Sequence, residues 1–240
     1  MKKFDCILVN GDSYSALDPD HLVYSQYLGQ QLGIPVINKA FVGTNNQRII
    51  RSTLESIDDL KQYKNPLVII GWSFIRRIEV WYYGDKDMTS YMPDRIAKAP
   101  EVVQPRFLTL EWLLKNNAAT LEEKMLVKEF DNVHKELTDF YTNLYMLSTT
   151  LKFHGIDYFF FSAAKNTDCN ISAFPYVTSL TQVTRCRDDA KMFNLHEFCI
   201  EEWATINDPE CKPVTKHLSG RGHKKFTEFL WNKIQLAYKE

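Results

Sequence analysis

A serine directly follows the first apolar run of the chain. The stretch "CILVNGDSYS", residues 6–15, indicates a buried strand that ends in a turn at Asn10–Ser13. A hydroxyl at the carboxyl end of the first strand of an α/β sheet lies where such sheets bind their ligands. Ser13 could therefore act as a nucleophile, anchor a phosphate group or cap the following helix, and the turn alone leaves all three roles open.

A nucleophilic serine needs a general base and hydrogen-bond donors for the oxyanion, and other parts of the chain must supply both. The carboxyl ends of all strands of a parallel sheet meet at one edge. Gly43 follows the second apolar run, the turn Gly71–Ser73 follows the third, and His217 precedes the last helical pattern. These positions can all reach the edge that carries Ser13, so we expect a hydrogen bond between Ser13 and His217.

Several further residues beside these turns are candidates for contacts with a substrate. They are Asp12, Asn45, Asn46, Trp72 and Arg76. The polar ones also have simpler structural uses, because Asp and Asn commonly cap helices and close turns, and an exposed Arg76 can pair with Glu79. Gly43 can likewise serve only to supply a backbone conformation with positive φ.

Strands and helices alternate along the chain. Apolar runs predict strands over residues 4–10, 34–41, 65–73 and 156–164. Helical patterns lie at residues 20–33, between Gly43 and residue 61, at about 121–152 and after His217, with only short helices expected between 165 and 216. In the last helix, Ser219 is the expected N-cap, and the apolar stripe consists of Phe226, Phe229, Leu230, Ile234 and Ala237. The βαβαβ order predicts an α/β fold in which helices cover both faces of a parallel sheet.

One segment breaks this rhythm. Residues 76 to about 120 are rich in aromatic, proline and charged residues and show no clean period. We interpret them as an insertion into a single domain of residues 1–240, since 45% hydrophobic composition supplies a full core. The insertion could form a lid or a sugar-stacking wall beside the site, or cover one sheet edge with a small core of its own. Its aromatic residues include Trp81, Tyr82, Tyr83, Tyr91 and Trp112, and we expect one of the first four on the wall of the cleft.

The composition argues against several classes of function. The 29 Lys and Arg residues nearly balance the 30 Asp and Glu residues, so no positive field is available to hold a nucleic acid. No apolar run is long enough to span a bilayer and the start "MKKFDCILVN" lacks the features of a signal sequence, so we expect no membrane partner and a cytoplasmic location. The five cysteines are odd in number and lack CxxC spacing, which argues against a disulfide framework and a zinc site. We expect neither a metal nor a cofactor.

Two motifs resemble those of the SGNH/GDSL hydrolases, a family of esterases and lipases. They are "NGDSYS" after the first strand and "HLSGRGHKKF" before the last helix, with Gly43 after the second strand and a Gly-x-x turn after the third. The resemblance covers nearly the whole chain from Cys6 onward. It implies a three-layer α/β/α flavodoxin-like fold with a mainly parallel central sheet. It also implies that Ser13 is the nucleophile, that His217 is the general base, and that the backbone N–H groups of Ser13 and Gly43 form part of the oxyanion hole.

Two positions depart from the pattern of that family. In the turn after the third strand the family has an asparagine that donates to the oxyanion, whereas this sequence has "GWSF" with Ser73 at that place. The family also has an aspartate three residues before the histidine, whereas this sequence has Val214. Asp208 and Glu210 are carboxylates that could reach His217 instead. Losing the acid that orients the histidine can lower the rate of a serine-triad enzyme by several orders of magnitude.

Three functions from different classes are therefore open. The leading expectation is a hydrolase that cleaves an ester, such as an O-acetyl group on a glycan or another small acyl ester. The second is a weakly active or inactive relative that keeps the site to bind a ligand or carbohydrate, which Val214 and Ser73 favour. The third is a protein that holds a phosphate group at the helix N-terminus after Ser13, although this loop lacks the several glycines of a phosphate cradle.

Overall fold

The computed structural model describes residues 2–75, 77, 133–165, 176–193, 195, 198–210 and 217–239 with their side chains, and the backbone alone of residues 79–81, 107–109 and 175. The chain divides into two compact units, of which the first contains Met1–Arg76 and Asn132–Glu240 and the second contains Arg77–Asp131. The predicted insertion, residues 76 to about 120, falls almost wholly within the second unit. There, β4 (Glu79–Trp81) pairs antiparallel with β5 (Phe107–Thr109).

Five parallel strands form the central sheet of the first unit, in the order β2-β1-β3-β6-β7. Their bounds are β1 (Cys6–Gly11), β2 (Val36–Asn38), β3 (Pro66–Trp72), β6 (Asp157–Ser162) and β7 (Met192–Phe193). This is the strand order of flavodoxin-like folds, and the predicted three-layer α/β/α fold is confirmed.

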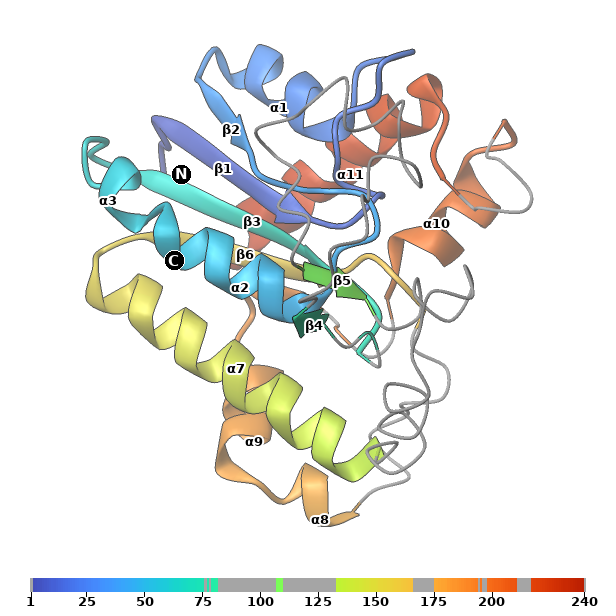
Figure 1. Cartoon of the computed structure of the whole chain (residues 1–240). Coiled ribbons are helices and arrows are strands. Elements are labelled where there is room, and N and C mark those ends of the chain that lie inside the picture. The colour runs from blue at the N-terminus through green and yellow to red at the C-terminus, as the bar shows by residue number, and fades with distance from the viewer. Residues whose placement is uncertain are drawn as a thin grey trace. The chain divides into compact units, whose positions relative to one another are not determined.

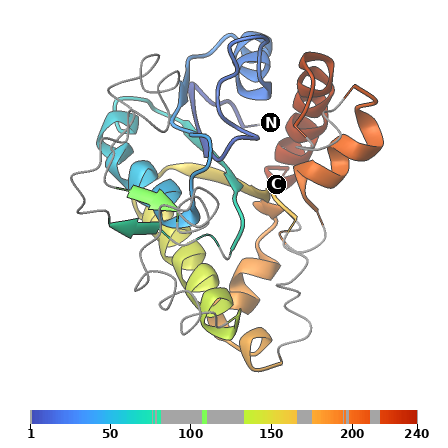
Figure 2. The same ribbon diagram turned by 45° about the vertical axis from the view of Figure 1, so that its right-hand side comes forward.

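Helices cover both faces of this sheet, as Figures 1 and 2 show. One face carries α2 (Asn46–Glu55), α3 (Ile57–Leu60), α7 (Val133–Phe153), α8 (Pro175–Thr178) and α9 (Thr181–Asp188). The other carries α1 (Tyr24–Leu32), α10 (Ile200–Asn207) and α11 (Gly220–Ala237). The two ends of the chain therefore meet on one face, because α1 and α11 pack against each other.

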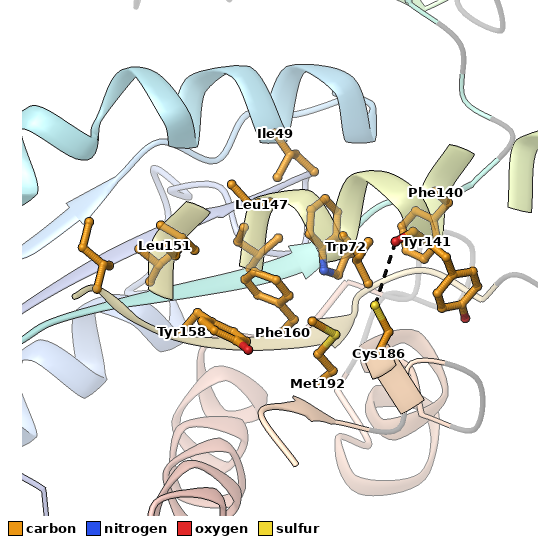
Figure 3. Close-up of a cluster of buried hydrophobic side chains, with 14 of the residues drawn as sticks. Ile49, Trp72, Phe140, Tyr141, Leu147, Leu151, Tyr158, Phe160, Cys186 and Met192 are labelled. Carbon is orange, nitrogen blue, oxygen red and sulfur yellow. Dashed lines mark hydrogen bonds between the residues drawn. The ribbon is translucent and has the colours of Figure 1, made fainter. Parts of the chain in front are cut away.

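Alternation along the strands creates a separate core on each face. In β3, Val68, Ile70 and Trp72 belong to the core that α2 and α7 close, whereas Leu67 and Ile69 belong to the core that α1 and α11 close. The first of these cores is drawn in Figure 3, where Trp72 lies among aromatic and aliphatic side chains from the strands and helices around it. All residues of the predicted stripe on the last helix take part in the second core.

The sheet reverses its direction of growth between β1 and β3, since β2 lies on one side of β1 and β3 on the other. Gly11 and Gly71 pair with each other at the carboxyl ends of these strands. A Cβ at Gly11 would lie 2.7 Å from the carbonyl oxygen of Gly71, and a Cβ at Gly71 would lie 2.8 Å from Ser15 Oγ. Glycine at both positions therefore lets the turn after β1 fold tightly over the edge of the sheet.

Several elements are shorter than the sequence predicted. The first helix begins at Tyr24 rather than at residue 20. At its N-terminus the Gln26 side chain accepts a hydrogen bond from the backbone N–H of Val23, the N-cap residue. The predicted helix up to residue 61 is interrupted at Ser56, between α2 and α3. Strand β7 was not predicted at all, because its two residues are too few to show a period.

Buried polar contacts fasten the start of α1 to the first turns of α11. The backbone N–H of Tyr24 donates to His223 Nδ1 at 3.2 Å, and Thr227 Oγ1 donates to the carbonyl oxygen of Tyr24 at 3.1 Å. His223 is 5% exposed. Burial, together with the nearby His21, lowers the pKa of His223 to about 4, even though Asp18 acts in the opposite direction. His223 is therefore neutral in the folded protein near pH 7 and accepts this hydrogen bond.

This histidine should make the folded protein sensitive to mild acid. The unfolded chain binds a proton at an ordinary histidine pKa, whereas the folded chain binds it only near pH 4. Stability is therefore full above about pH 6.5 and is lost as the pH falls toward 4, by about 2 kcal/mol on going from about pH 7.5 to about pH 5. The measurement is urea unfolding of the wild type and of His223→Asn, whose amide oxygen can replace Nδ1 as acceptor. The variant should lose this part of the pH dependence, and parallel curves for the two proteins would contradict the assignment.

Candidate active site

Ser13 and His217 meet at the carboxyl edge of the sheet. Ser13 follows β1, His217 lies three residues before α11, and the distance from Ser13 Oγ to His217 Nε2 is 3.0 Å. The predicted contact is confirmed. Both residues are partly exposed, so a ligand can approach them. The ring of Tyr14 contacts the imidazole edge to face, with 4.8 Å between ring centroids, and restricts its orientation. Sequence analysis missed Tyr14, although its place next to Ser13 was a signal.

Asp12 holds the turn that presents Ser13. Its backbone oxygen accepts from the N–H groups of Ser15 and Ala16, and its Oδ1 accepts from the N–H of Tyr14. Its Oδ2 accepts from the hydroxyl of Ser73 at 2.8 Å, which links the turn after β1 to the turn after β3. Asp12 is completely buried. The structure therefore places this predicted substrate-binding residue beneath the site, as a support for the turn.

Asn46 fastens the turn after β3 to the start of α2. Its Oδ1 accepts from the N–H of Ser73 at 2.9 Å, and its Nδ2 donates to the carbonyl oxygens of Ser73 and Phe74. Both hydrogen-bond donors of Ser73 are thus engaged, the N–H by Asn46 and the hydroxyl by Asp12. In this arrangement Ser73 has no donor left for an oxyanion.

Asn45 and Gly43 belong to the loop between β2 and α2. Asn45 is the N-cap of α2, since its Oδ1 accepts from the N–H of Arg48 at 3.0 Å. Gly43 is exposed and has a φ of 77°, a left-handed conformation that favours glycine. The N–H of Phe41 donates to the carbonyl oxygen of Gly11, which lays this loop beside the turn of Ser13.

The backbone donors of Ser13 and Gly43 are open to a ligand. Within the described part of the chain, the N–H groups of Ser13 and Gly43 have no hydrogen-bond partner. Ser13 and Gly43 are the two residues whose backbone groups were predicted to bind an oxyanion. Polar backbone groups left open at the end of a parallel strand are what such a site requires.

One predicted substrate-binding residue lies away from the site. Trp72 is completely buried and packs edge to face against Phe140 and Phe160, so its burial places it in the core rather than on a surface that a substrate reaches. Arg76 lies outside the described residues, as does Val214. The side chains predicted for the wall of the cleft, those of Trp81, Tyr82, Tyr83 and Tyr91, lie outside them as well, as does that of Trp112.

The carboxylates offered as substitutes for the family aspartate are both engaged near the start of α11. Asp208 accepts hydrogen bonds from Ser219, and Glu210 pairs with Arg221 at 3.9 Å. Arg221 and Ser219 both lie within four residues of His217, so these contacts concern the chain that carries the imidazole.

The described residues contain no group of three or more His, Cys, Asp or Glu side chains placed to hold a metal ion. Three cysteines in this part of the chain, Cys6, Cys186 and Cys199, are free and buried. Burial raises the pKa of Cys186 to about 12 and that of Cys199 to about 11, so both thiols are poor nucleophiles near pH 7. Among the described helices, none is both long and apolar enough to cross a membrane.

Residues 18–191 match the model of a family that is described as a family of unknown function (DUF6071). The chain belongs to this family. The match covers β2, β3, β6 and the helices between them, and it leaves Ser13 and His217 on either side. No curated protein matches this DUF6071 chain.

The hydrogen bond from the Ser73 hydroxyl to Asp12 should contribute more to the stability of this DUF6071 protein than most of its polar contacts. Ser73→Ala leaves a buried carboxylate oxygen without its donor, and hydrogen bonds to charged groups contribute about 1.5–3 kcal/mol. We therefore expect the free energy of unfolding to fall by about 2 kcal/mol in urea titrations. Ser162→Ala is the matched control, because the Ser162 hydroxyl is also in a buried strand-end setting but donates to a neutral carbonyl oxygen, and it should cost about 1 kcal/mol or less.

A double-mutant cycle isolates the pair. Asp12→Asn and Ser73→Ala should together cost less than the sum of their separate costs, by about 1 kcal/mol or more, because each removes the same interaction. Strictly additive losses would show that the 2.8 Å contact contributes nothing.

Proposed function

We propose that this protein is a serine hydrolase of the SGNH type that cleaves an ester, with Ser13 as nucleophile and His217 as general base. The observation that carries the proposal is the 3.0 Å contact between Ser13 Oγ and His217 Nε2, which joins residues 204 positions apart at the ligand-binding edge of the sheet. The order of the motifs "NGDSYS" and "HLSGRGHKKF" supports it. A nucleophile within hydrogen-bond reach of a base is the arrangement that acyl transfer to serine needs.

The chemistry divides into two acyl transfers. In the first, Ser13 Oγ attacks the ester carbonyl carbon while His217 Nε2 takes the hydroxyl proton. The backbone N–H groups of Ser13 and Gly43 donate to the oxyanion of the tetrahedral intermediate. Protonated His217 then gives its proton to the departing alkoxide. In the second transfer, His217 activates a water molecule that hydrolyses the acyl-serine and restores the hydroxyl.

The proposed substrate is a small acyl ester or an O-acetyl group on a glycan, and the reaction as written needs no cofactor, nucleic acid or membrane. A cytoplasmic location is part of the proposal, and the three free cysteines of the described residues are compatible with a reducing compartment.

A second candidate function is ligand binding without efficient turnover. It is favoured by Ser73, whose two donors are engaged by Asp12 and Asn46 where the SGNH hydrolases that the sequence resembles have an oxyanion donor. Val214 at the place of the family aspartate favours it too. This candidate keeps the same edge of the sheet as the binding site and assigns Ser13 a hydrogen bond to the ligand.

Covalent labelling distinguishes the two candidate functions. A fluorophosphonate should form an adduct on Ser13, and the wild type should hydrolyse an activated aryl ester slowly, because a good leaving group makes a small demand on the general acid and on the oxyanion hole. Ser13→Ala should abolish both while leaving Tm nearly unchanged, and His217→Asn should lower the rate by about 10³-fold or more. Mass spectrometry of the adduct and a spectrophotometric assay are the measurements.

Ser179→Ala is the control, because Ser179 is an exposed serine that follows α8. It should match the wild type in labelling and rate. Equal hydrolysis by the wild type and Ser13→Ala, with no adduct at Ser13, would remove the hydrolase proposal and leave the binding function.

A further inference from the structure

Asp208 directly follows α10 and is almost fully buried, with 1% of its surface exposed. Its carboxylate faces three donors. Oδ2 accepts from the backbone N–H of Ser219 at 2.7 Å, and Oδ1 accepts from the hydroxyl of Ser219 at 2.9 Å and from the backbone N–H of Glu210 at 3.2 Å. Because every partner is a donor, an ionised carboxylate fits this place and an amide would not.

These contacts fix the chain immediately after the proposed base. Ser219 lies two residues beyond His217 and is the N-cap of α11, since its hydroxyl oxygen accepts from the N–H of Gly222 at 3.0 Å. Asp208 therefore joins the end of α10 to the start of α11. The chain that carries His217 is held at both of its ends by one carboxylate.

The first turn of α11 is shaped around this carboxylate. A Cβ at Gly222 would lie 2.1 Å from Asp208 Oδ2, a separation that no side chain can adopt. Gly222 is therefore the residue that lets the carboxylate lie against the helix. The first turn of α11 contains no acidic residue of its own, so Asp208 supplies the negative charge that the positive end of the helix dipole favours.

We propose that Asp208 is the positioning residue for His217 and that it acts through Ser219, whose hydroxyl and backbone N–H it binds, rather than on the imidazole. The inference rests on the proposed function, since it concerns the base of that reaction. It assigns a different role from that of an orienting acid, whose carboxylate would accept a hydrogen bond from the imidazole ring directly. The two roles differ in how His217 depends on Ser219, because loss of the Ser219 hydroxyl releases His217 only when the carboxylate acts through it.

The decisive variants are at Ser219. Ser219→Ala removes the hydroxyl that links Asp208 to Gly222, so His217 should lose its fixed distance to Ser13. A displacement of about 1 Å at a catalytic group can lower the rate about 100-fold. We expect kcat on an activated aryl ester to fall by about 10- to 100-fold with KM nearly unchanged. Ser219→Thr keeps a hydroxyl N-cap and should restore most of kcat.

Asp208→Ala should lower kcat at least as much as Ser219→Ala. A matched control in the same helix is Thr227→Ala, because Thr227 is buried as Asp208 is and donates to the carbonyl oxygens of Tyr24 and His223. This control should lower Tm to a similar degree and leave kcat unchanged. Equal losses of kcat in Thr227→Ala and Ser219→Ala would show a general loss of stability and would overturn the positioning role.

An orienting acid predicts the opposite result at Ser219. If Asp208 oriented the imidazole directly, it could still do so without the Ser219 hydroxyl. Ser219→Ala would then keep the kcat of the wild type. That outcome also overturns the proposal.

NMR of the histidine rings tests the inference apart from activity. In the wild type His217 should give one set of ring resonances that changes on Ser13→Ala. Ser219→Ala and Asp208→Ala should broaden or shift these resonances, whereas Thr227→Ala and Ser219→Thr should not. A wild type without turnover and without an adduct at Ser13 defeats the proposed function alone, and the NMR result then still decides the role of Asp208. Unchanged His217 resonances in Ser219→Ala would reject it.

Discussion

The buried carboxylate of Asp12 is the constraint on which the site depends. It lies where β1 and β3 diverge and binds donors from both turns, the N–H of Tyr14 on one side and the hydroxyl of Ser73 on the other. A buried carboxylate is tolerated only when its oxygens are hydrogen-bonded, so the two turns cannot separate without a large desolvation cost. These hydrogen bonds hold the turn that carries Ser13. The same contact engages the hydroxyl of Ser73, so the open donors that the described residues are shown to offer near Ser13 are the backbone N–H groups of Ser13 and Gly43.

The site is assembled from the two ends of the chain, and its geometry follows from the packing of α1 against α11. The Thr227 hydroxyl donates to the carbonyl oxygen of Tyr24, the first residue of α1, and His223 Nδ1 accepts from the backbone N–H of Tyr24. Asp208 then holds the first turn of α11. The Asp208 contacts end at Ser219, two residues from His217, so the 3.0 Å distance to Ser13 depends on them, whereas the contacts of Tyr24 hold the two helices together.

Apolar runs, which are local signals, predicted β1, β2, β3 and β6, and the order of the two motifs predicted the pairing of Ser13 with His217. The core position of Trp72 could also have been predicted from the sequence. Val68, Ile70 and Trp72 follow the period of two along β3, which places Trp72 in the same core as the other two. Trp72 was predicted to bind substrate because it lies next to the turn after β3, a prediction that leaves this alternation out.

The roles of Asp12, Asn46 and Asp208 could not be predicted from the sequence, for a different reason. Their partners lie 61, 27 and 11 residues away, and the contacts exist only after the sheet has formed. Asp and Asn at turns have several equivalent uses, such as caps, and local propensity does not distinguish them. What decided their roles was the depth of burial, which one sequence does not show.

The magnitudes favour an ester over an amide as the proposed substrate. A missing side-chain donor in an oxyanion hole lowers the rate by about 10²–10³-fold, and a missing orienting acid lowers it by about 10⁴-fold. With Ser73 engaged and Val214 at the place of the aspartate, these losses add up to about 9 kcal/mol of barrier if neither is compensated. An amide has a poor leaving group that must be protonated by the histidine, so the same losses fall on a reaction that already has the higher barrier. An ester with a stable alkoxide makes the smallest demand on both missing groups, and a site that retains the serine, the histidine and two backbone donors is best matched to that chemistry.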